Sequence, residues 1–241
     1  MMKDEVFKNN LPNVDDFKFN SNVVNVFNDM VSRSVPFYNE IQRMITEIAA
    51  DFATKDKSVF DLGCSTGTTL INLDRVIDPS IKFVGTDNSE EMLGKCRKNF
   101  EEAGIRREYD LLKGDLNQGI MIDNASVVIM CLTLQFVRPM HREKLVESIS
   151  RQLDDYGCLI LVEKVLGEDS MFNRLFIKYY YEMKKRNHYS DMEISQKREA
   201  LENILIPYKL LENRELLLKS GFKYVDTFFK WYNFSGMVAV K

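Results

Sequence analysis

Val59-Phe-Asp61-Leu-Gly63-Cys64-Ser65-Thr-Gly67 is the stretch that decides the fold of this chain. It is typical of a buried strand that breaks into a glycine turn and then opens a helix. Glycine in such a turn takes φ > 0 and lets a ligand approach the backbone, and the following helix N-terminus offers unpaired N–H groups. Asp87 ends the next apolar run, where a carboxylate accepts both hydroxyls of a ribose. Together these features predict an adenosine-type cofactor site.

Composition places the chain among ordinary globular proteins. Of its 241 residues, 45% are hydrophobic and 29% charged, with a net charge of -3, which suits one α/β domain over residues 1–241. A negative net charge argues against direct nucleic-acid binding. The N-terminus lacks the apolar stretch of a signal peptide, and the longest apolar runs are too short to span a bilayer. We therefore expect a cytoplasmic protein that does not bind membranes.

The sequence shows no recognisable metal or hydrolase site. The cysteines have neither a zinc nor a redox spacing, so we expect no metal and interpret them as small apolar residues in a reducing compartment: Cys64, Cys96, Cys131 and Cys158. His141 and His188 are the only histidines. No Ser/His/Asp or Cys/His set is recognisable, so hydrolysis through a covalent nucleophile is not expected.

Apolar runs alternate with helical patterns through the middle of the chain. Strands are predicted at 58–62, 81–86, 109–112, 126–132 and 158–163. Helices are predicted at 69–77, from the N-cap Ser89 to Gly104, at 145–153 and at 214–220. This alternation predicts a doubly wound, mostly parallel sheet of the Rossmann type.

The C-terminus has a different pattern. Strands at 224–232 and 234–240 are separated by a tight turn near Asn233, so they must pair antiparallel. A seven-stranded sheet that ends in an antiparallel hairpin is the layout of methyltransferases that use S-adenosyl-L-methionine (SAM). A dinucleotide is disfavoured because Asp61 would repel its pyrophosphate.

That layout assigns provisional roles to the residues at the strand ends. Gly63 and Ser65 contact the methionine part of SAM, and Asp87 binds the ribose. Asp115, with the backbone of Leu116, lies near the adenine.

Two segments lie outside the alternating pattern. Residues 1–50 predict a polar, irregular, partly ordered arm up to residue 20, followed by two helices that Pro36 separates. Residues 164–212 are rich in aromatic residues and helix formers, and we predict a helical insertion that covers the ligand-binding edge of the sheet. Its basic residues form either a solvated helix face or cations that pair with a carboxylate: Lys184, Lys185, Arg186, Lys197 and Arg198.

Several segments together resemble one family. From about residue 20 to its C-terminus the chain is similar to carboxy-S-adenosyl-L-methionine synthases. The similar segments are Val26–Tyr38, Asp61–Gly67, Thr133–Phe136, Tyr189–Arg198, Leu201–Asn203 and Asn233-Phe234. Ile194-Ser-Gln-Lys-Arg198 is the most specific of these, because ordinary methyltransferases differ from one another in this insertion.

The resemblance implies an activity and partners. The family carboxylates the methyl group of SAM, with prephenate as carboxyl donor, and produces carboxy-SAM and phenylpyruvate. A tRNA-modifying carboxymethyltransferase then uses carboxy-SAM to build the 5-oxyacetyl group on wobble uridine. The resemblance also implies a homodimer, with its interface in the insertion. The matching positions are expected to bind SAM: Tyr38, Gly63, Cys64, Ser65, Asp87, Asn88, Asp115, Leu116, Cys131 and Arg198.

Arg198 is the expected catalytic residue. The resemblance implies that it binds the new carboxylate, and that in the family it reaches across from the other protomer. The chemistry needs such a cation, because an ylide formed next to the sulfonium would capture CO₂ released from prephenate. The protein then supplies orientation, dryness and a positive charge rather than an acid or a base.

One position departs from the family pattern, and two other functions stay open. Cys131 stands where asparagine is expected, and a thiol cannot make the hydrogen bonds of an amide. An ordinary small-molecule SAM-dependent methyltransferase would explain the glycine turn and Asp87, but not Ser195–Arg198. A non-catalytic scaffold for a tRNA-modifying partner is disfavoured by the intact SAM motif.

Overall fold

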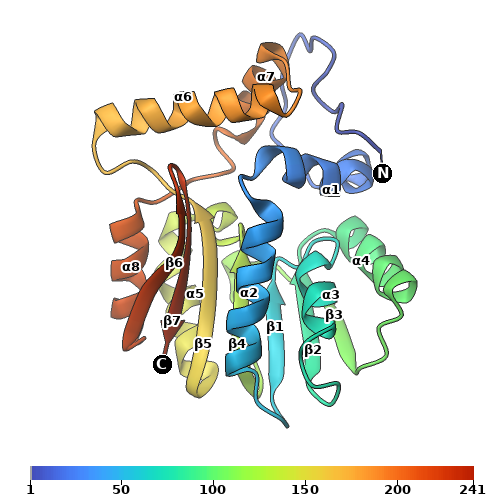
Figure 1. The fold of residues 1–241 in the computed structure, drawn as a ribbon, viewed down its shortest axis with the longest axis vertical. Coiled ribbons are helices and arrows are strands. Elements are labelled where there is room, and N and C mark those ends of the chain that lie inside the picture. Colours follow the sequence, from blue (N-terminus) through green and yellow to red (C-terminus); the bar gives the residue numbers. More distant parts are fainter. Residues whose placement is uncertain (1) are drawn as a thin grey trace.

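The sheet predicted from the sequence is present in the computed structural model, which describes residues 2–241 (Figure 1). Its strands are β1 Ser58–Leu62, β2 Lys82–Asp87, β3 Tyr109–Lys113, β4 Ala125–Cys131, β5 Leu153–Lys164, β6 Tyr224–Trp231 and β7 Phe234–Val240. Their order is β3-β2-β1-β4-β5-β7-β6. The first five run parallel, and β7 pairs antiparallel with both β5 and β6. The predicted fold class is therefore confirmed.

Helices cover both faces of the sheet, as a doubly wound fold requires (Figure 1). On one face lie α2 Tyr38–Phe52, α3 Thr68–Asp74 and α4 Glu90–Ala103, and on the other lie α5 Pro139–Gln152 and α8 Leu210–Lys219. Residues of the central strands are shared between the two cores: Val59 packs with α2 and α3, whereas Phe60 and Leu62 pack with α5. Burial on both faces explains why the central strands read as continuous apolar runs.

Three helix boundaries differ from the sequence prediction. The helix expected at 69–77 ends at Asp74. The helix expected at 145–153 begins at Pro139, since proline suits the first helical turn, and Leu153 instead begins β5. The helix expected at 214–220 begins at Leu210, where Glu212 bonds back to the backbone of Lys209.

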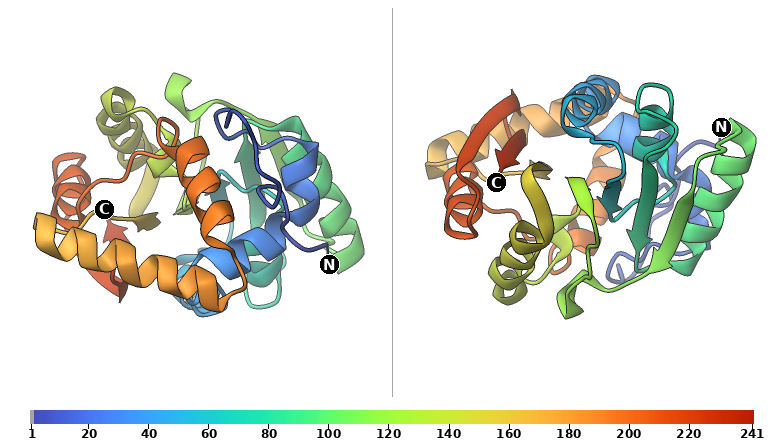
Figure 2. Two further views of the ribbon diagram at one scale, coloured as in Figure 1. Left: turned by 90° about the horizontal axis from the view of Figure 1, so that it is seen from above. Right: turned by 90° about the horizontal axis from the view of Figure 1, so that it is seen from below.

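A separate layer lies beyond the carboxyl ends of the parallel strands. It consists of the N-terminal residues 2–20 together with α1 Ser21–Ser34, α6 Ser170–Arg186 and α7 Asp191–Leu201. Viewed from above, these segments lie over the edge of the sheet (Figure 2). Asn20 and Asp169 cap α1 and α6, and Ser190 with Glu193 forms a capping box on α7. We call this layer the cap.

Residues 2–20 contain no helix or strand, as expected, but they are more tightly packed than the predicted arm. Phe7 and Phe17 are buried. The Gln196 amide of α7 donates to the carbonyls of Phe7 and Asn9, at 2.9 Å each, and accepts from the N–H of Leu11 at 2.7 Å. Side-chain hydrogen bonds thus replace a backbone ladder in this segment. Among residues 2–241, no helix has the length and apolar character needed to span a membrane.

Candidate active site

A cavity of about 350 Å³ lies between the carboxyl ends of the strands and the cap. This volume is in the range of small-molecule sites. All ten residues that the sequence predicted for the SAM site lie on its wall: Tyr38, Gly63, Cys64, Ser65, Asp87, Asn88, Asp115, Leu116, Cys131 and Arg198. The fold thus brings together side chains from segments that are up to 160 positions apart in the sequence.

The glycine turn after β1 is held by main-chain hydrogen bonds. The N–H groups of Gly63 and Cys64 both donate to the carbonyl of Thr86, at 2.8 and 2.9 Å, at the end of β2. Gly63 has φ 83°, and a Cβ atom there would lie 2.4 Å from Thr133 Oγ1. Only glycine fits this position, because it needs both the left-handed conformation and the space.

Asp87 connects this turn to the next helix. Its carboxylate accepts from the backbone N–H groups of Ser65, at 3.0 Å, and Ser89, at 2.9 Å. Burial raises its pKa, while these N–H donors act in the opposite direction. Asp61 lies behind the turn rather than on the cavity wall, where burial and the charge of Asp87 raise its pKa to about 7. The sheet side of the cavity is therefore acidic and is organised by backbone donors.

Asp115 ends the segment after β3 and begins the 3₁₀ helix η1 (Leu116–Gln118). Its Oδ1 accepts from both the backbone N–H and the side-chain amide of Asn117, at 2.9 and 2.8 Å. These bonds lower the pKa of the carboxyl group. Asp115 and Leu116, which the sequence predicts near the adenine, line the same cavity as Asn88.

Sequence reasoning missed Glu163, which organises the loop after β4. This buried carboxylate accepts from three consecutive N–H groups, of Thr133, Leu134 and Gln135, at 3.1, 3.0 and 2.7 Å. Burial raises its pKa to about 8, and the three donors oppose that shift. The bonds fix η2 (Leu134–Phe136) beside the glycine turn. The sequence could have indicated Glu163, because it is the single acidic residue at the end of the apolar run of β5.

Cys131, the position that departs from the family pattern, lies on the cavity wall near the start of α2. The Gln42 amide nitrogen donates to Cys131 Sγ at 3.7 Å. The Gln42 Oε1 atom is buried and has no hydrogen-bond partner among residues 2–241. Burial raises the pKa of the Cys131 thiol and of the Tyr38 phenol, so both stay neutral.

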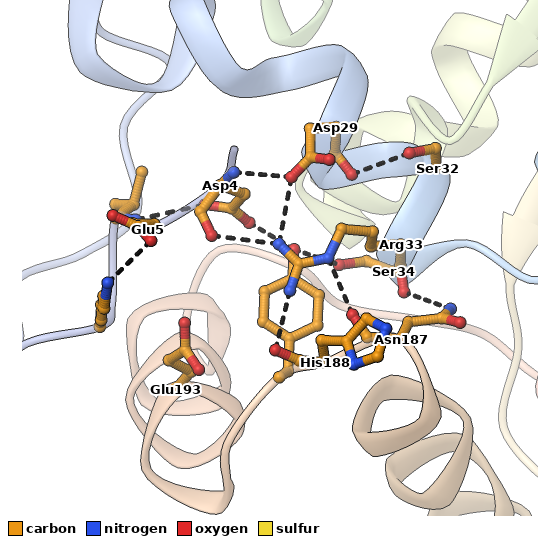
Figure 3. A network of polar contacts seen from close by, with 12 residues as sticks. Asp4, Glu5, Asp29, Ser32, Arg33, Ser34, Asn187, His188 and Glu193 are labelled. Carbon is orange, nitrogen blue, oxygen red and sulfur yellow. Dashed lines mark hydrogen bonds and ion pairs between the residues drawn. The ribbon is translucent and has the colours of Figure 1, made fainter. Parts of the chain in front are cut away.

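Arg33 of α1 connects the segments of the cap through hydrogen bonds (Figure 3). Its guanidinium donates to the carbonyls of Asn187 and His188, at 2.8 and 3.0 Å, in the turn between α6 and α7. It also donates to the carbonyl of Asp4 and to the carboxylate of Asp29, at 3.2 and 3.1 Å. One side chain therefore joins the N-terminal segment, α1 and the insertion.

The cap side of the cavity is cationic. Lys184, Lys197 and Arg198 of the cap lie on its wall, and Lys164 joins them from the end of β5. The solvated-face interpretation is wrong for Lys184 and Lys197, which are only 6% and 7% exposed. It holds for Lys185 and Arg186, which are exposed.

Arg198 lines the cavity of its own chain and is exposed to solvent. Its place on the wall therefore does not depend on a second protomer. The expectation that it reaches into a neighbouring subunit stays a prediction.

The titratable groups around the cavity suit binding and charge stabilisation. Neither histidine lies on the cavity wall that residues 2–241 form. Within the same residues, no group of three or more His, Cys, Asp or Glu side chains is placed to hold a metal ion. Such a site can orient charged ligands between an acidic, backbone-lined wall and a cationic wall, and exclude water from between them.

Comparison with known proteins supports both the fold and the family resemblance. Residues 59–157 match a family described as a methyltransferase domain. An O-methyltransferase family protein from Burkholderia thailandensis has a TM-score of 0.66 at 14% identity over 92% of this chain and 60% of that chain. Human N-acetylserotonin methyltransferase, solved with SAM, has a TM-score of 0.59 at 15% identity over 91% of this chain and 55% of that chain. At these identities the similarity concerns the fold.

Similarity over the whole chain is more specific. Carboxy-S-adenosyl-L-methionine synthase from Methylococcus capsulatus is 57% identical over 100% of both chains. The protein of the same name from Desulfotalea psychrophila is 44% identical over 99% of this chain and 97% of its own length. The resemblance seen in the sequence is confirmed, and the chain belongs to the carboxy-S-adenosyl-L-methionine synthase family.

Proposed function

We propose that this protein transfers a carboxyl group from prephenate to the methyl group of SAM, giving carboxy-SAM and phenylpyruvate. One observation carries the proposal beyond family membership: Arg198 and three lysines, two from the cap and one from the end of β5, lie on the same cavity as the glycine turn and Asp87. Methyl transfer from SAM to a neutral acceptor needs no such cations, whereas a carboxyl donor and its carboxylate-bearing products carry negative charge that such cations can bind.

The proposed reaction balances without a metal or a redox partner. Prephenate loses its ring carboxyl group as CO₂ and its ring hydroxyl as hydroxide, and the ring becomes aromatic in phenylpyruvate. The hydroxide takes a proton from the SAM methyl group, which gives water and a sulfonium ylide. The ylide carbon then forms a bond to CO₂. Proximity of the two reactants is the main requirement.

The protein's own residues act on charge and position in this scheme. The turn at Gly63, Asp87 and Asp115 hold SAM on the sheet side. Arg198 receives the carboxylate that forms on the methyl carbon, since its guanidinium is always charged and can bind a carboxylate through two hydrogen bonds.

Mass spectrometry tests this function directly. The purified protein is incubated with SAM, with and without prephenate, and the nucleoside products are identified. We expect a product heavier than SAM by the mass of CO₂, with an equal amount of phenylpyruvate. SAM that stays unchanged with prephenate, but gives S-adenosylhomocysteine with a methyl acceptor, would instead support an ordinary methyltransferase.

Substitution of Arg198 tests its role separately. Arg198→Ala should bind SAM as the wild type does but lose the preference for carboxy-SAM, because only the latter carries the extra carboxylate. Arg186→Ala, on an exposed arginine outside the cavity wall, is the matched control. An unchanged preference in Arg198→Ala would remove this arginine from the mechanism.

We further propose a homodimer that forms through α6. Met171, Leu175 and Tyr179 recur at a spacing of four and are 52%, 37% and 38% exposed, so α6 presents an apolar stripe to solvent. Light scattering of the wild type and of Leu175→Glu would test this, with a dimer expected for the first and a monomer for the second.

The remaining proposals concern the protein's place in the cell. Its product carboxy-SAM is passed to a tRNA-modifying carboxymethyltransferase for the 5-oxyacetyl group of wobble uridine. All of this takes place in the cytoplasm, which agrees with the four free cysteines. Loss of the 5-oxyacetyl nucleoside from tRNA of a deletion strain, and its return with the wild-type chain, would support this role.

A further inference from the structure

Two lysines on the cavity wall have no anionic partner. Lys164 ends β5, and Lys184 lies in the last turn of α6. Among residues 2–241, neither ammonium group pairs with a carboxylate or donates a hydrogen bond. Both lie over the ring of Tyr180, with Nζ at 5.1 Å from its centroid for Lys164 and 4.5 Å for Lys184.

Lys184 is buried and Lys164 is half-buried. A lysine in such surroundings without an anion is unusual, because removing its charge from water costs free energy. A ring face attracts the cation but accepts no ordinary hydrogen bond from it. Lys197, by contrast, has polar partners: its Nζ donates to Ser34 Oγ at 3.1 Å and lies 3.6 Å from Asp4 Oδ2. Lys164 and Lys184 therefore differ from Lys197 in having no such partner.

The pKa values of Lys164 and Lys184 also favour a bound anion. Burial lowers the pKa of Lys164 to about 8. Burial, and then the charges of Lys197 and Lys164, lower the pKa of Lys184, while Asp4 acts weakly in the opposite direction. An anion bound between the two lysines would relieve both the repulsion and the burial cost.

We propose that Lys164 and Lys184 form the subsite for the carboxylate of the donor that is not transferred. This inference rests on the proposed function, in which the donor carries two carboxylates and the transferred one goes to Arg198. The untransferred carboxylate belongs to a 2-oxo acid side chain, which remains in the phenylpyruvate product. Two separate cationic positions would fix the direction of the donor relative to the SAM methyl group.

The test measures kinetics and product binding in Lys164→Met, Lys184→Met and the double variant. Methionine keeps the length of the side chain and removes its charge. We expect the KM for prephenate to rise about tenfold in each single variant, as for loss of a hydrogen bond to a charged group. The affinity for phenylpyruvate, measured by calorimetry, should fall in parallel. The affinity for SAM should stay within about twofold, because SAM lies on the sheet wall.

Three further variants check that the effect belongs to the charges of these two lysines. Lys185→Met removes an exposed lysine that pairs with Asp191 outside the cavity, and it should change neither binding constant. Arg198→Ala should leave phenylpyruvate binding unchanged, because this product lacks the transferred carboxyl group. Lys184→Arg keeps the charge and should recover most of the phenylpyruvate affinity.

Several outcomes would overturn the inference. One is a double variant that keeps both its affinity for phenylpyruvate and its affinity for SAM. Another is an equal loss of the affinities for phenylpyruvate and SAM that Lys184→Arg does not recover. If the wild type makes no carboxy-SAM from prephenate, the proposed function fails, but calorimetry with phenylpyruvate still decides the subsite. If phenylpyruvate binds and its binding depends on Lys164 and Lys184, the two lysines remain a site for a 2-oxo acid. If phenylpyruvate does not bind, the proposal is wrong.

Discussion

The two walls of the cavity are built in opposite ways. The sheet wall comes mostly from neighbouring strand ends, and backbone N–H groups of Gly63, Cys64 and Ser65 hold it together. The cap wall joins segments as far apart as Asp4 and Tyr189, and charged or polar side chains hold it together. Main-chain geometry tolerates sequence change, so the sheet wall can persist among proteins that share only the fold. The cap depends on a few individual side chains.

The largest effect is expected from breaking the sheet wall at Gly63. Gly63→Ala places a Cβ atom 2.4 Å from Thr133 Oγ1 at a backbone φ of 83°. We expect a loss of about 3 kcal/mol in the free energy of unfolding and of most SAM affinity, since strain and overpacking act together. Thermal unfolding with and without SAM measures both.

Gly94 in α4 provides the control, because a Cβ atom there has nothing within 4 Å. Gly94→Ala should stabilise the protein by about 1 kcal/mol through helix propensity and leave SAM binding intact. Equal behaviour of the two variants would show that the turn is not constrained as described.

Breaking the cap wall should have the next largest effect. Arg33→Ala removes hydrogen bonds to Asp4, Asp29, Asn187 and His188 and leaves a partly buried carboxylate without its partner. We expect the free energy of unfolding to fall by about 3 kcal/mol. Hydrogen exchange should become faster in residues 2–20 and α7 than in the sheet. SAM affinity should fall less than in Gly63→Ala.

Arg43→Ala is the matched control for this substitution. Arg43 pairs with two carboxylates, of Glu40 and Glu47, whereas Arg33 pairs with one, but the side chain of Arg43 is 54% exposed. Solvent screens such pairs, so stability and hydrogen exchange should stay unchanged. If Arg33→Ala behaves like this control, the cap is held by something other than Arg33.

The difference between the walls also explains what the sequence could predict. Local sequence patterns predict the glycine turn, Asp87 at the end of a strand, and the antiparallel hairpin. The structure places all three where these patterns predict them. Lys184 and Lys197 lie on helices whose local pattern equally suits a solvated face, yet both are buried. Their burial depends on residues 2–20 and α1 packing against the insertion, and a single sequence has no periodic signal for that contact.

The pH dependence of stability should report on Asp61, which lies behind the glycine turn of the sheet wall. Burial and the charge of Asp87 raise the pKa of Asp61 from 3.8 to about 7. The folded state then holds a proton that the unfolded state has lost, so the contribution of Asp61 to stability falls as pH rises from about 4 to 7. Asp61→Asn removes this titration. Its stability relative to the wild type should therefore rise by about 2 kcal/mol between pH 4 and pH 6.

Denaturant unfolding at several pH values measures this difference. Asp123→Asn, on an exposed aspartate outside the cavity, serves as the control and should show no such change. A difference between Asp61→Asn and the wild type that is independent of pH would mean that Asp61 is ionised in the folded state throughout this range.

The smallest effect is expected where the sheet meets α2, at Cys131. The neighbouring Gln42 Oε1 is buried and lacks a partner among the described residues, and a thiol is only a weak donor. Cys131→Asn introduces an amide that can donate to this oxygen, so the free energy of unfolding should rise by about 1 kcal/mol. Thermal unfolding would show this as an increase of about 2–4 °C in Tm. Cys131→Ser has a shorter polar group and should gain less. An equal loss of stability in both variants would show that burying a new polar group here costs more than a hydrogen bond to the unpaired oxygen contributes.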